Sequence, residues 1–155
     1  GGMKKRLSLA ICMLERPDLL LLDEPTAGLD PKERIVFRNL IASLAGECTI
    51  LLSTHIVSDI ESIADDVLVM KEGCIFAHDT CETLLKSMQG KVWEVSFPVQ
   101  EANRKSQNHI IVKTHQQDHQ IYMRILADHH PYPHAHPVLP DLDDYYLYHF
   151  NEGSD

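Results

Sequence analysis

The chain has 155 residues, 44% of them hydrophobic, which is enough for one medium domain or for a small domain with part of another. Its formal net charge is −9, from 23 acidic and 14 basic residues. Such an acidic chain is a poor candidate for nonspecific nucleic-acid binding, which requires a basic face, and no nucleic-acid partner is expected. The basic residues do cluster once, at Lys4, Lys5 and Arg6, where three charges on one helical turn are expected to form a solvated face.

The cysteines and the hydropathy pattern indicate in which cellular compartment the chain is expected. None of the four cysteines is spaced as C-x-x-C and no zinc pattern appears, so a reduced, cytosolic environment is expected. No stretch approaches the ~20 apolar residues of a membrane span, and no signal peptide is apparent. The chain is therefore expected not to cross a membrane itself, although it could dock onto a protein that does. The first residue is Gly1 rather than methionine, and we expect a truncated chain.

The first segments alternate between helix and strand. Apolar residues recur at helical spacing from residue 3 to residue 16, which predicts a helix that stops at Pro17. Its apolar stripe consists of Met3, Leu7, Ala10, Ile11 and Leu14. The apolar run 19–22 predicts a strand buried on both faces. Asp30 followed by Pro31 predicts an N-cap with proline at the first helical position, and this helix should run to about residue 44.

Four further segments continue this order. They are a second apolar strand, a short helix, a hairpin around Glu72-Gly73, and a helix that Asp79 caps and Gly90 ends. In chain order they cover residues 48–53, 56–64, 67–71 with 74–78, and 79–90. The alternation predicts an α/β fold with parallel strands.

The pattern changes near residue 91. Three segments then alternate apolar and polar residues, which predicts antiparallel strands with one exposed face. These strands are residues 91–97, 109–115 and 120–127, followed by a proline- and histidine-rich linker, 128–140, and an aromatic helix, 141–150. The predicted domains are therefore 1–90 and a small α+β accessory domain, 91–155.

Two adjacent carboxylates, Asp23 and Glu24, follow the apolar run 19–22. Acids at the end of a buried strand are costly unless they serve a cation or a reaction, and open α/β sheets bind ligands at the carboxyl ends of their strands. Asp23 is expected to hold Mg²⁺ through water, and Glu24 to polarise an attacking water as a general base. The alternative is a surface turn after a strand.

The residues around this pair form an ordered set. Gly1-Gly2-Met3 precedes the first helix, residues 23–31 read Asp-Glu-Pro-Thr-Ala-Gly-Leu-Asp-Pro, and Ser53-Thr54-His55 follows the second predicted strand. This set resembles the ATP-binding-cassette (ABC) ATPase family over residues 1–90. The resemblance implies the C-terminal half of a P-loop NTPase-type nucleotide-binding domain, with ATP and Mg²⁺ as cofactors.

The resemblance also implies a role for each motif. Gly1, Gly2 and Met3 correspond to the end of the signature motif, which caps the γ-phosphate of ATP on the opposite subunit. A helix N-terminus attracts an anion, and glycine allows the backbone to approach a phosphate closely.

Residues 19–24 correspond to the Walker B strand and residues 27–30 to the D-loop, whose Asp30 lies at the dimer interface. His55 corresponds to the switch histidine, which contacts the γ-phosphate and orients water and Glu24. The alternatives are a flexible terminus for the glycines, a plain helix cap for Asp30 and a strand-ending residue for His55.

The sequence departs from the family pattern at several places. Met3 replaces the usual glutamine, a change that export-type relatives tolerate. The Leu-Ser of the signature motif, the P-loop, the adenine-stacking aromatic residue and the Q-loop glutamine are all absent from the 155 residues. All of them normally precede the signature glycines, and truncation explains their absence together.

Two clusters near the C-terminus have both a plain and a functional interpretation. The histidines are His129, His130, His134 and His136. They could bind a metal, but adventitious surface histidines are favoured because no carboxylate or cysteine joins them at ligand spacing. The aromatic residues are Tyr145, Tyr146, Tyr148 and Phe150, for which packing of a terminal helix is favoured over an interaction face.

The sequence thus predicts the ATP-binding subunit of an ABC transporter that couples Mg-ATP hydrolysis to export. A nucleotide-sandwich dimer implies a second nucleotide-binding subunit, and transport implies transmembrane permease subunits, with the protein peripheral at the cytoplasmic face of the cell membrane. The chain alone should be inactive because it lacks a P-loop. The alternatives are a soluble ABC ATPase that acts in DNA repair or on the ribosome, or an inactive fragment that serves as a binding or regulatory module.

Overall fold

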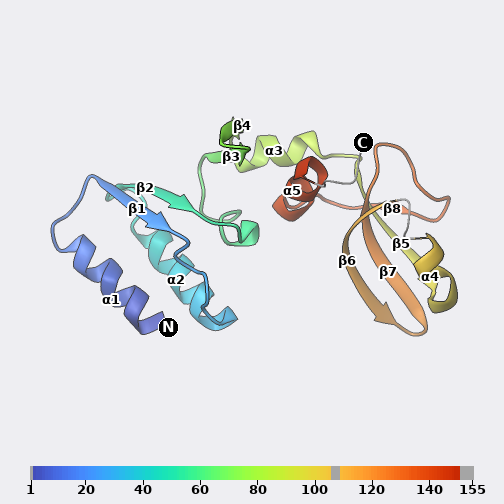
Figure 1. The fold of residues 1–155 in the computed structure, drawn as a ribbon, viewed down its shortest axis with the longest axis horizontal. Helices are drawn as coiled ribbons and strands as arrows, with labels where there is room; N and C mark the ends of the chain where they lie inside the picture. Colours follow the sequence, from blue (N-terminus) through green and yellow to red (C-terminus); the bar gives the residue numbers. More distant parts are fainter. Residues whose placement is uncertain (1, 106–108, 151–155) are drawn as a thin grey trace. The chain divides into compact units, whose positions relative to one another are not determined.

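The computed structural model describes residues 2–105 and 109–150 (Figure 1). The chain divides into two compact units, Gly1–Ala64 and Asp65–Asp155. Both contain helices and strands. A search of residues 2–105 and 109–150 for helices that could cross a lipid bilayer finds none. All four cysteines are free thiols.

The first unit is a two-stranded parallel sheet with two helices. Its elements are α1 (Gly2–Met13), β1 (Leu19–Asp23), α2 (Pro31–Ser43), β2 (Thr49–Ser53) and the 3-10 helix η1 (Val57–Asp59). The register of β1 and β2 runs from Leu19 opposite Thr49 to Asp23 opposite Ser53, so the carboxyl ends of both strands lie side by side. The helix predicted over 56–64 is present only as η1 and the turns that follow it.

Both helices cover the same face of this sheet (Figure 1). The buried core consists of Leu9, Leu20, Leu29, Phe37 and Ile41. The opposite face carries Leu19, Leu21 and Leu51, whose exposed fractions are 54%, 66% and 53%. The prediction that residues 19–22 are buried on both faces is therefore wrong for the described chain. Side chains alternate along a strand, and the described helices lie on one side only.

Helix α1 packs through a different face from its apolar stripe. Leu9 is buried, whereas Leu7, Ile11 and Leu14 are 62%, 57% and 80% exposed. The helix ends at Met13, three residues before the predicted end. Hydrophobic spacing identified a helix here but not the side through which it packs.

Helix α2 begins as predicted. The Asp30 carboxylate accepts a hydrogen bond of 2.8 Å from the Glu33 N–H, and Pro31 occupies the first helical position. This cap pairs one of the N–H groups that a helix start leaves without an intrahelical partner. The helix ends at Ser43, with Leu44 as its C-cap residue, close to the predicted end near residue 44.

The described residues of the second unit form a hairpin, three helices and an antiparallel sheet. Its elements are β3 (Val67–Lys71), β4 (Cys74–Asp79), α3 (Cys81–Ser87), β5 (Val92–Pro98), α4 (Val99–Lys105), β6 (Ile110–Gln117), β7 (Gln120–Leu126), β8 (His136–Pro137) and α5 (Leu142–Phe150). The sheet order is β6-β7-β5-β8. Its core is formed by Trp93, Val95, Phe97, Ala102, Met123, Ile125 and Ala135. The cap of α3 is Thr80 rather than the predicted Asp79, because the Thr80 hydroxyl accepts the hydrogen bond from the Thr83 N–H.

The structural division at Ala64 precedes the predicted boundary near residue 90. The hairpin β3–β4 belongs to the second unit because its side chains pack on α5. Lys71 Nζ donates to the His149 carbonyl at 3.1 Å, and the Phe76 ring lies 5.1 Å from the His149 ring and 6.0 Å from the Phe150 ring. Contacts between segments distant in sequence therefore assign this hairpin to the second unit.

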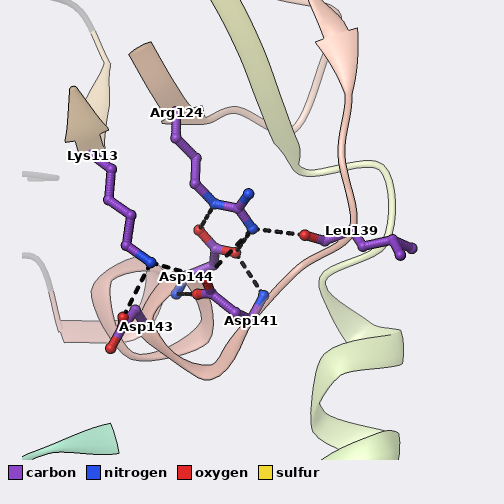
Figure 2. Close-up of polar contacts among 6 residues, drawn as sticks. All are labelled: Lys113, Arg124, Leu139, Asp141, Asp143 and Asp144. Atoms are coloured by element: carbon purple, nitrogen blue, oxygen red, sulfur yellow. Dashed lines mark hydrogen bonds and ion pairs between the residues drawn. The ribbon is translucent and has the colours of Figure 1, made fainter. Parts of the chain in front are cut away.

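A buried ion pair attaches α5 to the antiparallel sheet (Figure 2). Asp144 is fully buried, and both of its carboxylate oxygens accept hydrogen bonds from the Arg124 guanidinium. Asp141 caps the helix: its carboxylate accepts from the Asp144 N–H at 3.0 Å, and its own N–H donates to Asp144 at 2.7 Å. Lys113 is more exposed, and its Nζ atom lies 3.1 Å from the Asp141 carboxylate and 3.3 Å from the Asp143 carboxylate.

Candidate functional site

The parallel register brings the two predicted motifs together at the carboxyl ends of β1 and β2. Asp23 pairs with Ser53, and the Ser53 hydroxyl donates to the Asp23 carboxylate at 2.5 Å. The Glu24 N–H donates to the Ser53 carbonyl at 2.9 Å, one residue beyond the strands. Residues about thirty positions apart thus share one edge of the sheet. In α/β sheets this edge is where ligands bind.

Glu24 and His55 form the central contact of this site. His55 Nδ1 lies 2.8 Å from Glu24 Oε1, and the His55 backbone N–H donates to the same oxygen at 3.0 Å. The Thr54 hydroxyl donates to the other oxygen at the longer distance of 3.4 Å. An ionised carboxylate only accepts hydrogen bonds, so the network assigns the proton to Nδ1 of His55. The Nε2 atom of the ring then remains for another partner.

This environment keeps Glu24 in its charged form at neutral pH. The hydrogen bond from the His55 side chain lowers the pKa of Glu24 below its ordinary value of 4.5, although burial opposes that shift. A carboxyl group with a lowered folded-state pKa is ionised at neutral pH, and its contribution to stability is lost as the pH falls through that lowered value. A general base must be deprotonated to act, so this direction suits that role.

The segment that links Glu24 to α2 is a compact turn. Glu24 itself has φ = 44°, in the left-handed region that side chains with a Cβ rarely adopt. Pro25, Thr26 and Leu29 are buried, and the Ala27 N–H donates to the Glu24 carbonyl at 3.2 Å. The strained backbone of Glu24 is held by this turn, and such strain often accompanies functional sites.

The structure does not bring the predicted glycine motif into this group. Gly1 lies outside the described residues. Gly2 is buried at the start of α1, where a Cβ would overlap the Glu33 carboxylate, and Met3 is 78% exposed. In the described part of the chain, no hydrogen bond or ion pair joins Gly2 or Met3 to Asp23, Glu24 or His55. The role of Asp30 as helix cap is observed, and its role at a dimer interface stays a prediction.

One residue at the site was missed by the sequence analysis. Lys5 of α1 donates through Nζ to the Ala27 carbonyl at 2.6 Å and to the Glu24 carbonyl at 3.2 Å. Its neighbours Lys4 and Arg6 are exposed, whereas Lys5 is half-buried. Lys5 lies four residues before buried Leu9 and three after buried Gly2, so helical periodicity could have placed it on the packed face.

The oxygen atoms at this edge suit Mg²⁺. The exposed Asp23 carboxylate and the Ser53 hydroxyl are hard donors of the kind that Mg²⁺ accepts. Among the described residues, no group of three or more His, Cys, Asp or Glu side chains could hold a metal. A cation at Asp23 would therefore take most of its ligands from water and substrate, as Mg²⁺ commonly does.

The histidine-rich segment contributes packing contacts. The His130 ring lies 4.8 Å from Trp93, and the His134 ring lies 5.3 Å from Phe97. His134 Nε2 is also 3.2 Å from the Ser96 carbonyl. These rings pack on the antiparallel sheet, and they form no metal-binding group in the part of the chain that the structure describes.

Comparison with known proteins shows similarity to ATP-binding proteins of ABC transporters. A family model described as ABC transporter matches residues 1–27. The "Nod factor export ATP-binding protein I" of Bradyrhizobium sp. (strain SNU001) is 43% identical over 86 residues, which are 55% of this chain and 28% of the relative. The matched part of the chain is therefore similar to the ATP-binding proteins of ABC transporters. The chain also resembles the "Uncharacterized ABC transporter ATP-binding protein YxlF" of Bacillus subtilis, which is 38% identical over 96 residues.

These matches cover a limited share of each relative. The aligned residues are 62% of this chain and 32% of the Bacillus protein, so the chain spans less than a third of the relatives' length. The "ABC transporter A family member 1" of Dictyostelium discoideum is 35% identical over 97 residues, 63% of this chain and 11% of that protein. Because 86 residues exceed the 64 of the first unit, the similarity to this relative extends into the second unit.

Proposed function

We propose that this chain carries part of the nucleotide site of an ABC-type ATPase, which couples hydrolysis of Mg-ATP to export across a membrane. The observation that carries the proposal is the Glu24–His55 pair at the carboxyl ends of two parallel strands. The names of the relatives, which include an export ATP-binding protein, support transport as the coupled process. ATP is the proposed nucleotide because the matching family binds ATP.

Each side chain has a defined task in this proposal. Glu24 accepts the proton of the attacking water through the oxygen that His55 leaves free, and the contact with His55 fixes the orientation of the carboxylate. His55 Nε2, on the far side of the ring, contacts the γ-phosphate. Asp23 holds Mg²⁺ through water, with Ser53 beside it. Bound Mg²⁺ would neutralise charge on the phosphate oxygens.

The remaining site residues and partners extend the same proposal. Gly1, Gly2 and Met3 act on a nucleotide held by a second nucleotide-binding subunit, and Asp30 lies at that interface. Transmembrane permease subunits are the other partners, which places the protein at the cytoplasmic face of a membrane. The P-loop NTPase-type fold is proposed for residues 1–90. The antiparallel sheet of residues 91–155 is proposed as an accessory domain.

Two exposed apolar surfaces of the first unit support the proposal that another protein segment packs against it. One is the sheet face of Leu19, Leu21 and Leu51, and the other is the outer stripe of α1, which includes Leu7 and Ile11. Parallel sheets normally have both faces covered. A segment that supplies the P-loop would cover apolar surface of this kind.

We expect the 155-residue chain alone to release phosphate from ATP no faster than a buffer blank. The chain contains no G-x-x-x-x-G-K-[ST] sequence, and without it the β- and γ-phosphates lose their main cradle. A phosphate-release assay with and without Mg²⁺ tests this. Robust turnover that disappears in Glu24→Gln would contradict it. A chain that serves only as a binding or regulatory module would also be inactive. The assay is therefore repeated on a polypeptide with a P-loop segment joined before Gly1, in which only the ATPase proposal expects phosphate release.

In such a P-loop-containing polypeptide, His55→Ala is expected to lower kcat by about 10²–10³-fold, the usual loss for one contact to a developing negative charge. ATP affinity should change little, because most binding contacts lie elsewhere. His78→Ala is the matched control, since His78 is an exposed histidine of the second unit. A wild-type kcat in His55→Ala, with only a small change in melting temperature, would show that His55 merely ends a strand.

A further inference from the structure

Lys5 joins both ends of the turn that carries Glu24. Its ammonium group donates to the Glu24 carbonyl at 3.2 Å and to the Ala27 carbonyl at 2.6 Å, while the Ala27 N–H closes the turn on the Glu24 carbonyl at 3.2 Å. No other described side chain donates to either carbonyl. Hydrogen bonds from a charged donor are stronger than neutral ones, so Lys5 is the principal side-chain support of this turn.

The backbone of Glu24 needs such support. Its φ of 44° is unfavourable for a residue with a Cβ, and such a conformation persists only when surrounding contacts fix it. The Glu24 N–H is held by the Ser53 carbonyl at 2.9 Å, on the sheet side. Lys5 holds the opposite end of the same residue, its carbonyl, from α1. The two contacts together determine the direction in which the Glu24 side chain leaves the backbone.

We propose that Lys5 is a positioning residue for the hydrolysis reaction, which holds the Glu24–Ala27 turn so that the Glu24 carboxylate stays in contact with His55. The proposal rests on the proposed function, in which Glu24 is the general base. Lys5 itself touches neither the carboxylate nor the imidazole; its contacts are with backbone carbonyls. It acts through Glu24.

The kinetic test uses a polypeptide with a P-loop segment joined before Gly1 and three variants. Lys5→Met keeps the length of the apolar stem and removes the donors, Lys5→Arg restores a charged donor, and Lys4→Met changes the exposed neighbour. Lys5→Met should lower kcat by about 10- to 100-fold, the range expected for a displaced catalytic group. The KM for ATP should change by less than about twofold, because a base contributes to turnover rather than to nucleotide binding. Lys5→Arg should recover most of the kcat, and Lys4→Met should match the wild type.

Amide hydrogen exchange on the same proteins without nucleotide gives a second measurement. The His55 N–H donates to the Glu24 carboxylate, so its exchange should accelerate by about tenfold in Lys5→Met and not in Lys4→Met. Unchanged kcat and unchanged exchange in Lys5→Met would overturn the proposal. So would a loss of kcat that Lys4→Met shares, or faster exchange throughout the first unit with a parallel drop in melting temperature, since these indicate only a general loss of stability. If the wild type does not hydrolyse ATP, the proposed function fails, while the exchange data still judge the role of Lys5 in holding the turn.

Discussion

Replacing Glu24 with glutamine in a P-loop-containing polypeptide is expected to slow ATP hydrolysis by about 10²–10⁴-fold, the usual contribution of a general base. A glutamine side chain has nearly the same shape but cannot take a proton from water. Its amide oxygen can still accept the hydrogen bonds from the His55 N–H and Nδ1, so the local geometry should be kept. The measurement is steady-state phosphate release at saturating Mg-ATP.

Glu15→Gln is the matched control for this substitution. Glu15 is an exposed carboxylate of the same unit, and the same change of charge there should leave the turnover rate unaltered. Equal loss in both variants would attribute the effect to net charge. Wild-type turnover in Glu24→Gln would remove Glu24 from the mechanism.

Breaking the ion pair that holds α5 is expected to destabilise the second unit by about 3–5 kcal/mol, the usual cost of leaving a buried charge without its partner. In Arg124→Met, the fully buried Asp144 carboxylate loses both guanidinium hydrogen bonds (Figure 2). The Leu139 carbonyl, which accepts from the same guanidinium at 2.6 Å, loses that donor as well. Trp93 is the single tryptophan of the chain and lies in the core of this unit, so its fluorescence during urea unfolding reports the change directly.

Lys113→Met is the control within the same network. Lys113 is 56% exposed and contacts Asp141 and Asp143 from the rim, so its loss should cost about 1 kcal/mol or less. A similar unfolding midpoint for Arg124→Met and the wild type would show that α5 is held by its aromatic packing rather than by the ion pair.

Local chemistry made part of this structure predictable from sequence. Asp30 followed by Pro31 identified the start of α2, because a cap and a proline act on the adjacent N–H groups and need no distant partner. The carboxylates Asp23 and Glu24 were predicted at the end of a strand, and the structure places them there with Ser53 and His55 alongside. Their catalytic roles remain proposals.

Features that depend on distant packing were not predictable in the same way. A hydrophobic stripe on α1 shows that a helix has an apolar side, yet α1 packs through another side: Leu9 joins the core, and Lys5 donates to the Ala27 carbonyl. Lys5 belonged to a basic cluster expected to be solvated, and only the three-dimensional position of the Glu24–Ala27 turn gives it partners. The unit boundary at Ala64 likewise depends on contacts of Lys71 and Phe76 with α5, which lies far along the chain.

The oligomeric state of the Glu24→Gln variant in a P-loop-containing polypeptide, measured by size-exclusion chromatography with light scattering, tests whether Glu24 is the general base of a nucleotide-bound dimer. A protein that binds Mg-ATP and cannot hydrolyse it should accumulate as the nucleotide-bound dimer, because loss of the base leaves the Asp23 carboxylate and the nucleotide contacts in place. We expect the variant to be a dimer with Mg-ATP and a monomer without nucleotide, and the wild type to return to monomer as ATP is consumed. A variant that stays monomeric with Mg-ATP and hydrolyses it at the wild-type rate would exclude Glu24 as the base of such a dimer.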